Sequence, residues 1–252
     1  MLDIKVLKAH ELEFIFKHVK LEGWDVEELH IRCQYKAHPK DFFIAYKDNK
    51  AIGFILAIKH SDYFGFISTL LVLKEFRKNG YGTELLQYGI KHLAGCQIAL
   101  NSVKNKESLY EKFGFKSYFD QINYKFIVGS IVKDVSHTLD DFDSKLSLNG
   151  RSKYEECIFT NKNIRYKAIT ANNIISSFGI SSKYLDGYKV VINSKNIDEA
   201  LSLFFELIKE FDNGDAIYIE STKMEAVTIR LVKYLNMIEY SSLTRMYNKV
   251  LI

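Results

Sequence analysis

The sequence predicts a mixed α/β protein, and three observations carry that prediction. Short β-rich runs alternate with stretches whose apolar residues recur at helical spacing. A basic loop with two glycines, Arg77-Lys78-Asn79-Gly80-Tyr81-Gly82, lies between an apolar run and a helical pattern. Hydrophobic residues make up 47% of the 252 residues and there is a single proline, so we expect a well-packed core rather than disorder.

The first half of the chain reads as β-α-α-β-β-β-α-β-α-β, an antiparallel front followed by a crossover helix to a parallel strand. Strand patterns cover Asp3–Leu7, Asp41–Tyr46, Ala51–Ile58, Tyr63–Leu73, Gln97–Asn101 and a last strand pair within Tyr118–Val128. Helical spacing of apolar residues covers Glu11–Leu21, Val26–Tyr35, Thr83–Leu93 and the stretch around Ser108–Phe113. Lys47-Asp48-Asn49-Lys50 reads as the turn of a hairpin.

The second half repeats the back half of this order. Its strands are expected at Tyr188–Asn193, Ala216–Glu220 and Tyr240–Leu251, and its helices at Asp198–Phe211 and Met224–Leu235. Between the halves, Gly129–Tyr184 is poorly patterned, with a partly helical stretch in Leu146–Cys157 and a strand at Ile164–Ile169. Neither later helix follows an Arg-x-x-Gly-x-Gly loop. We therefore expect two domains, 1–128 with the loop and 129–252 without it.

The glycine loop is suited to binding a pyrophosphate. A basic loop between a strand and a helix offers free backbone N–H groups and the positive end of a helix. Glycine lets the backbone approach the anion where a Cβ would obstruct it. A dinucleotide fingerprint is excluded because Leu85 occupies the third glycine position, and no Gly-Lys-Ser/Thr triplet forms a Walker loop. Taken alone, these six residues are also compatible with an ordinary strand–helix turn.

The loop resembles the acetyl-CoA pyrophosphate loop of the GNAT acetyltransferase superfamily. Leu109-Tyr110-Glu111-Lys112-Phe113-Gly114-Phe115 is similar to the superfamily's second signature, a helix that carries a tyrosine and ends in Gly-Phe. Further matches resemble a bacterial tandem type: Glu22-Gly23-Trp24, Asp41-Phe42-Phe43, Gly53-Phe54-Ile55, Phe64-Gly65-Phe66-Ile67, Asn123-Tyr124 and Thr244-Arg245-Met246-Tyr247. The resemblance implies the GNAT acyl-CoA N-acyltransferase fold, a mixed central sheet flanked by helices, in a catalytic domain followed by a degenerate GNAT-like domain.

The same resemblance implies a set of cofactor contacts. The backbone of Leu71, Val72 and Leu73 would hold the pantetheine arm, and Asn101 would contact the cofactor or a bridging water. The pyrophosphate would be surrounded by Arg77, Lys78, Asn79, Gly80, Tyr81, Gly82 and Thr83. Tyr110 would be the general acid for the CoA thiolate, with a packed helical tyrosine as the alternative. The chain departs from the superfamily pattern at Val103 and Lys106, where an Asn and an Ala are common.

The acceptor side is less clearly patterned. Glu22, Trp24 and Asp25 lie in the segment that usually walls the acceptor site, although Asp25 also reads as a helix cap and Trp24 as a core residue. The general base is not evident, and a water relay is an alternative to a carboxylate. The sequence predicts an acetyl-CoA-dependent N-acetyltransferase acting on a primary amine. The alternatives are a non-catalytic acyl-CoA-binding sensor, transfer to a hydroxyl, or use of a longer acyl chain.

Composition limits the partners. The formal net charge of +4 is spread along the chain, which is too mild to imply nucleic-acid binding. The 3 cysteines and 7 histidines show no metal-ligand spacing, so we expect no metal. No signal-peptide pattern opens the sequence and no apolar run approaches membrane-spanning length, so we expect a cytoplasmic protein without membrane contact. The oligomeric state is left open between monomer and homodimer.

Overall fold

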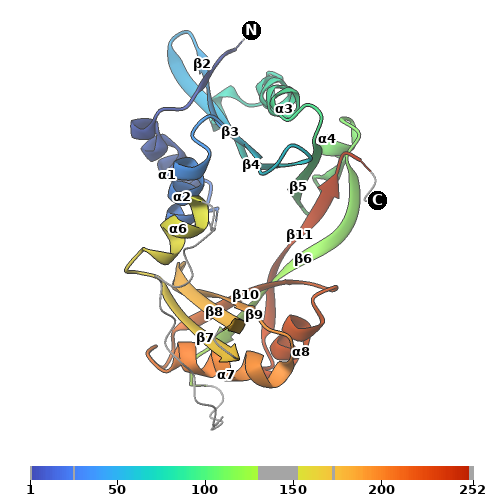
Figure 1. The fold of residues 1–252 in the computed structure, drawn as a ribbon. Coiled ribbons are helices and arrows are strands. Elements are labelled where there is room, and N and C mark those ends of the chain that lie inside the picture. The colour runs from blue at the N-terminus through green and yellow to red at the C-terminus, as the bar shows by residue number, and fades with distance from the viewer. Residues whose placement is uncertain (1, 25, 130–152, 172–173, 250–252) are drawn as a thin grey trace. The chain divides into compact units, whose positions relative to one another are not determined.

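The computed structural model describes residues 2–24, 26–129, 153–171 and 174–249. Contacts divide the chain into two compact units, which Figure 1 shows along the colour ramp. Unit 1 is Met1–Tyr118 together with Thr244–Ile252, and unit 2 is Phe119–Leu243. Strands β6 (Lys116–Ile127) and β11 (Ile238–Tyr247) therefore contribute residues to both units.

Unit 1 is a mixed sheet with the strand order β1-β2-β3-β4-β5, followed by the end of β11. Its other strands are β1 (Asp3–Val6), β2 (Phe42–Lys47), β3 (Lys50–Lys59), β4 (Phe64–Val72) and β5 (Gln97–Val103). Its helices are α1 (Leu12–Leu21), α2 (Glu28–Ala37), α3 (Tyr81–His92) and α4 (Glu107–Glu111), with 3-10 turns η1 (Ala9–Glu11) and η2 (Lys74–Phe76). Neighbouring strands from β1 to β4 are antiparallel, whereas β4 and β5 are parallel.

Two apolar cores lie on the two faces of this sheet. The period of two along each strand separates them, because successive side chains point to opposite faces. On one face Leu85 and Leu86 of α3 pack with Ile67, Ile98 and other buried residues. On the other face α1 packs with α2 and with strand residues that include Phe54 and Leu71. Figure 1 shows α1 and α2 on the side of the unit 1 sheet away from α3.

Unit 2 has the strand order β6-β10-β9-β8-β7, with β11 beside β6. Its remaining strands are β7 (Arg165–Ala171), β8 (Ile174–Tyr184), β9 (Gly187–Asn193) and β10 (Ala216–Thr222). Its helices are α6 (Lys153–Phe159), α7 (Ile197–Ile208) and α8 (Ala226–Tyr234). One core gathers the apolar stripes of α7 and α8, in which Phe204 and Leu231 are fully buried, against β6, β9 and β10. As in unit 1, antiparallel strands lead to a parallel pair, here β9 and β10.

The structure confirms the predicted mixed α/β order and corrects it in one place. The expected strand pair in Tyr118–Val128 is one strand, β6, because the stretch has no glycine or proline for a tight turn and pairs with β10 instead. Strand β8 fills part of the poorly patterned segment between the halves. The contacts divide the chain after Tyr118 and return the residues from Thr244 to unit 1, whereas the expected domain boundary lies at residue 128. The neighbouring strands β5 and β11 are far apart in the sequence, so their association leaves no local signal.

Candidate functional site

The parallel strands β4 and β5 stop pairing partway along their length, and we call this point the parting of the two strands. Their paired residues run from Phe64 with Gln97 to Ile67 with Leu100, and the described residues show no further pairs between them. Both strands continue, β4 to Val72 and β5 to Val103. Within the described residues, β4 beyond Ile67 therefore has no ladder partner on β5, and a strand edge of this kind can pair with an extended ligand.

A bulge in β4 accompanies the parting. The register with β3 shifts between Leu71 and Ser68, and Thr69 has a positive φ of 49°. A non-glycine residue in this region is uncommon, and bulges recur beside active sites because they re-aim the strand. The Leu73 amide donates to the Ile52 carbonyl of β3 at 2.8 Å. Because the hydrogen-bonding direction of the backbone alternates along a strand, the Leu71 backbone faces β3 as well. Of the three predicted pantetheine contacts, Val72 is therefore the one whose backbone faces the side of β5.

The loop after β4 is held by its own side chains. Arg77 donates from Nε to the Val72 carbonyl at 2.8 Å and pairs through a second nitrogen with Glu22 Oε1 at 2.7 Å. Asn79 donates from Nδ2 to the carbonyls of Phe76 and Arg77, both at 3.2 Å. Arg77 and Asn79 therefore shape the loop. Lys78 and Gly80 adopt left-handed φ angles of 66° and 81°, which turn the chain into α3.

The N-terminus of α3 is open. Its N-cap residue is Gly80, which makes no side-chain cap, so the first amides of the helix, at Tyr81, Gly82 and Thr83, receive no capping bond from it. A Cβ added at Gly82 would meet only Val72 Cγ2, at 3.8 Å, and one at Gly80 would meet nothing within 4 Å. Packing within the protein thus gives no reason for the glycine at Gly82. The space above these amides fits an anion that approaches the backbone closely.

Tyr110 lies on α4, and its ring packs against the core under α3, 6.4 Å from the Phe115 ring. Gly114, with φ of 83°, ends this short helical segment and lets Phe115 turn back into the core, where it is 1% exposed. Within the described residues the Tyr110 hydroxyl has no hydrogen-bond partner. Burial raises the pKa of Tyr110, so its hydroxyl is protonated at neutral pH and can donate a hydrogen bond.

The residues expected on the acceptor side take different positions. Glu22 lies at the end of α1 and binds Arg77, and this hydrogen bond lowers the pKa of Glu22. It is therefore an ionised carboxylate that ties the glycine loop to α1. Trp24 is 39% exposed, and Asp25 lies outside the described residues. Helix α2 begins at Glu28 with Glu27 as its N-cap, so the expected cap at Asp25 is not the one observed.

The last strand supplies contacts that the local sequence pattern does not reveal. Arg245 of β11 donates from Nε to Asn101 Oδ1 at 2.5 Å, at the point where β5 leaves β4. Thr244 donates from its hydroxyl to Glu107 Oε1 at 2.8 Å, on the helix that carries Tyr110. Asn101, expected near the cofactor, thus has its side-chain oxygen engaged by Arg245. The partners are far apart in the sequence, so the predicted strand Tyr240–Leu251 and the family-like motif Thr244-Arg245-Met246-Tyr247 indicated the strand but not these contacts.

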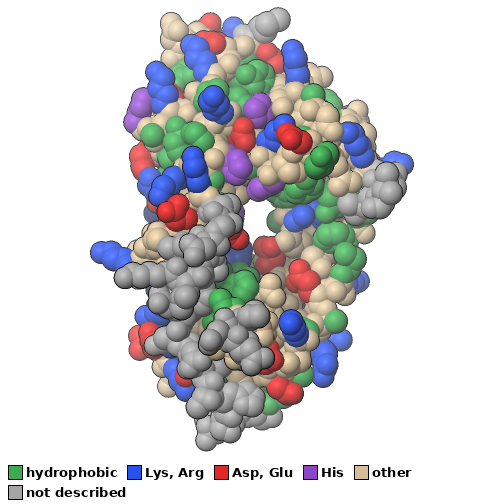
Figure 2. Space-filling view, in the orientation of Figure 1, with side chains coloured by type: hydrophobic (Ala, Val, Ile, Leu, Met, Phe, Trp, Pro, Cys, Tyr) green, Lys and Arg blue, Asp and Glu red, His purple; other side chains and the backbone are tan. Residues whose placement is uncertain are grey.

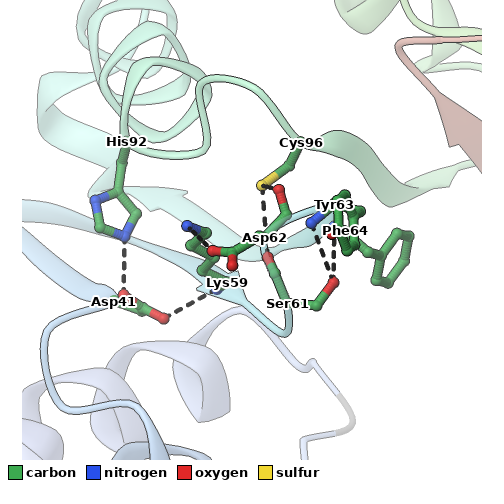
Figure 3. A network of polar contacts seen from close by, with 8 residues as sticks. All are labelled: Asp41, Lys59, Ser61, Asp62, Tyr63, Phe64, His92 and Cys96. Carbon is green, nitrogen blue, oxygen red and sulfur yellow. Dashed lines mark hydrogen bonds and ion pairs between the residues drawn. The ribbon is translucent and has the colours of Figure 1, made fainter.

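A second polar network lies at the opposite end of β4, as Figure 3 shows. Asp41 is 8% exposed and accepts from the Lys59 amide at 2.9 Å, while its other oxygen lies 2.8 Å from His92 Nε2. The network joins the start of β2 to β3 and to the last residue of α3. It is a structural clasp in the part of unit 1 away from the glycine loop.

The corresponding position in unit 2 is closed. Strands β9 and β10 also pair over a short stretch, Gly187 with Ala216 to Lys189 with Tyr218. Helix α7 then starts with Asn196 as N-cap, whose Oδ1 accepts from the Glu199 amide at 2.9 Å. Asp198 and Glu199 place two carboxylates in the first turn. A helix end that is already capped and carries negative side chains does not attract a pyrophosphate.

Three observations on the described part of the chain concern membrane spans, metal groups and surface charge. None of its helices is long and apolar enough to cross a membrane. Its His, Cys, Asp and Glu side chains form no group of three or more with the geometry of a metal site. On the face that Figure 2 shows, basic and acidic side chains are interspersed.

The strands β4 and β5 thus stop pairing beside the uncapped, glycine-led N-terminus of α3. Residues 7–115 match the model of the acetyltransferase (GNAT) family. The match contains β4, the loop, α3 and Tyr110, so it covers the candidate site except for the end of β11.

Similar proteins extend the likeness to the whole chain. A holothin acyltransferase from Pseudoalteromonas sp. (strain SANK 73390) is 20% identical over 255 residues, covering 96% of this chain and 86% of that protein. A crystal structure of a candidate acetyltransferase from Pyrococcus horikoshii has a TM-score of 0.76 at 16% identity, covering 100% and 90% of the two chains. A tandem GNAT protein from the clavulanic acid biosynthesis pathway has a TM-score of 0.70 at 10% identity, covering 98% of each. These matches show that the chain has the GNAT fold.

Proposed function

We propose that the protein transfers an acetyl group from acetyl-CoA to a primary amine. The observation that carries the proposal is the parting of β4 and β5 next to the open N-terminus of α3. GNAT proteins use acyl-CoA as cosubstrate, and this geometry suits a ligand with an anionic pyrophosphate and an extended, hydrogen-bonding arm. The pyrophosphate lies at the amides of Tyr81, Gly82 and Thr83, and the pantetheine arm follows the backbone at Val72.

The residues divide the binding work in a definite way. Lys78, whose side chain forms no ion pair with the other described residues, adds positive charge beside the loop, whereas Arg77 and Asn79 keep the loop in shape. Gly82 supplies the close approach. The N-terminus of α7 in unit 2 is capped, so we propose one acetyl-CoA per chain and no pyrophosphate site in the domain expected at residues 129–252.

The transfer requires one bond to form and one to break. The amine nitrogen attacks the thioester carbon, a C–N bond forms, and the C–S bond breaks to release the CoA thiolate. Tyr110 donates a hydrogen bond or its proton to that sulfur, because burial keeps the hydroxyl protonated and it has no other partner in the described residues. Glu22 is committed to Arg77, so the proton lost by the amine leaves through water.

One observation favours a second candidate function, a non-catalytic acyl-CoA-binding module. Glu22, one of the residues expected on the acceptor side, is engaged in an ion pair with Arg77, and its lowered pKa makes it a weak base. A fold alone does not guarantee a reaction. A module of this kind would bind acetyl-CoA and release no thiol.

Thiol release from acetyl-CoA, followed with a panel of amines, separates the two functions. We expect amine-dependent thiol release by the wild type, and turnover about tenfold to a hundredfold lower in Tyr110→Phe with unchanged acetyl-CoA affinity. Tyr63→Phe is the matched control, because Tyr63 is 83% exposed and should leave turnover unchanged. The panel includes small amines and a lysine peptide, with longer acyl-CoAs because the relative named above is an acyltransferase. Binding without release for every amine would favour the module.

A further inference from the structure

The last strand of the chain ends inside unit 1. Thr244 and Met246 are 6% and 0% exposed, and Met246 belongs to the core under α3. Because side chains alternate along a strand, Arg245 points to the opposite face of the sheet. The strand end is anchored to β5 at Asn248, which accepts from the Ile98 amide with its side chain and donates its own amide to the Ile98 carbonyl. Arg245 is thus held in a fixed place on the sheet.

The contacts of Arg245 span the point where β4 and β5 part. Its Nε donates to Asn101 Oδ1 at 2.5 Å, and Asn101 follows Leu100, the last paired residue of β5. Its guanidinium carbon lies 5.0 Å from the centre of the Phe66 ring, and Phe66 precedes Ile67, the last paired residue of β4. The planar guanidinium can donate in its plane and stack over a ring at the same time, which an ammonium group does less well.

Thr244, the residue before Arg245, contacts the helix α4. Thr244 donates to Glu107 Oε1 at 2.8 Å, in the first turn of α4. Two adjacent residues of β11 therefore contact β4, β5 and the helix that carries Tyr110.

We propose that Arg245 is a positioning residue for the thioester end of the acyl-CoA site. It holds Phe66 and Asn101 at a fixed separation and so sets the width of the opening between β4 and β5. The inference rests on the proposed function, because it places the thioester between these strands. It predicts that losing Arg245 weakens binding of the acylated arm while the pyrophosphate loop, formed by other residues, keeps its affinity.

Two probes separate these parts of the site in the full chain. ADP carries the adenosine and the pyrophosphate without the pantetheine arm, and acetyl-CoA carries these together with the arm and the thioester. Binding of each is measured by calorimetry for the wild type, Arg245→Met, Arg245→Lys and Gly82→Val. For Arg245→Met we expect acetyl-CoA affinity to fall about tenfold with ADP affinity within about twofold of the wild type. For Gly82→Val both affinities should fall. Arg245→Lys should lie between Arg245→Met and the wild type.

A control variant and the pattern of the two affinities separate a loss of positioning from a general loss of structure. Arg230→Met removes an exposed arginine from α8 and should change neither affinity. Acetyl-CoA affinity of Arg245→Met within about twofold of the wild type would overturn the positioning role. An equal fall for both probes would also overturn it, because that result indicates a general loss of structure. A wild type that binds neither probe would overturn the proposed function itself and this inference with it.

Discussion

Replacing Gly82 by alanine should make the protein more stable and its acetyl-CoA affinity weaker. Gly82 is the second residue of α3, and a Cβ there would meet only Val72 Cγ2, at 3.8 Å, an ordinary contact. Glycine in a helix costs about 0.5 to 1 kcal/mol relative to alanine, because the glycine backbone loses more freedom on folding. With no clash to offset this gain, Gly82→Ala should be stabilised by up to about 1 kcal/mol, or a few degrees in Tm.

The same substitution should weaken the binding of acetyl-CoA. A methyl group at Gly82 fills the space through which a pyrophosphate oxygen reaches the helix amides. Loss of one hydrogen bond to a charged group corresponds to about 1.5 to 3 kcal/mol, hence a tenfold or greater loss of acetyl-CoA affinity.

Urea unfolding and calorimetric titration of acetyl-CoA measure the two effects on the same samples. Gly89→Ala is the control within the same helix, because its Cβ would lie 2.8 Å from Ile55 Cδ1 and should destabilise the protein. A Gly82→Ala variant that keeps wild-type acetyl-CoA affinity would refute the assignment of this glycine to ligand approach. A destabilised Gly82→Ala variant would refute the reading of its surroundings as open.

Three further predictions concern the supporting structure. Arg77 lowers the pKa of Glu22 in the folded protein, so the pair contributes stability above the pKa of an unfolded glutamate, about 4.3. That contribution is lost as the pH falls through the lower folded pKa, so the stability difference between wild type and Glu22→Gln should shrink as the pH falls below about 4.3 in urea titrations. Asp41→Asn should lower the free energy of unfolding by about 1 to 3 kcal/mol at neutral pH in the same assay, since both carboxylate oxygens accept hydrogen bonds in a buried place. An Asp41→Asn variant as stable as the wild type would contradict a structural role for this network. Asn196→Ala should cost about 1 kcal/mol through loss of the α7 cap, yet create no second acetyl-CoA site, which titration would reveal.

The sequence predicts the parts of the site that are local. The glycine loop, α3 and the Tyr110 helix are each built from residues close in the chain, and turn chemistry and apolar periodicity identify them. The order of strands β1 to β5 follows for the same reason. The structural match to proteins of the GNAT fold then confirms the predicted fold class.

The sequence does not predict the contacts that join distant elements. The pairing of Arg77 with Glu22 and of Arg245 with Asn101 depends on tertiary packing, which leaves no periodic pattern. The predicted strand pair in Tyr118–Val128 was wrong for a similar reason, because β6 finds its partner β10 far along the chain. The roles of Tyr110 and of the loop residues in binding and catalysis stay predictions.

The central claim is that one of two similar halves carries a single acyl-CoA site, formed at the open end of α3 and absent at the capped end of α7. Calorimetric titration of the full chain with acetyl-CoA tests this most directly. The account predicts one molecule bound per chain, and loss of that binding in Gly82→Val. Two molecules bound per chain, or none at millimolar acetyl-CoA, would contradict it.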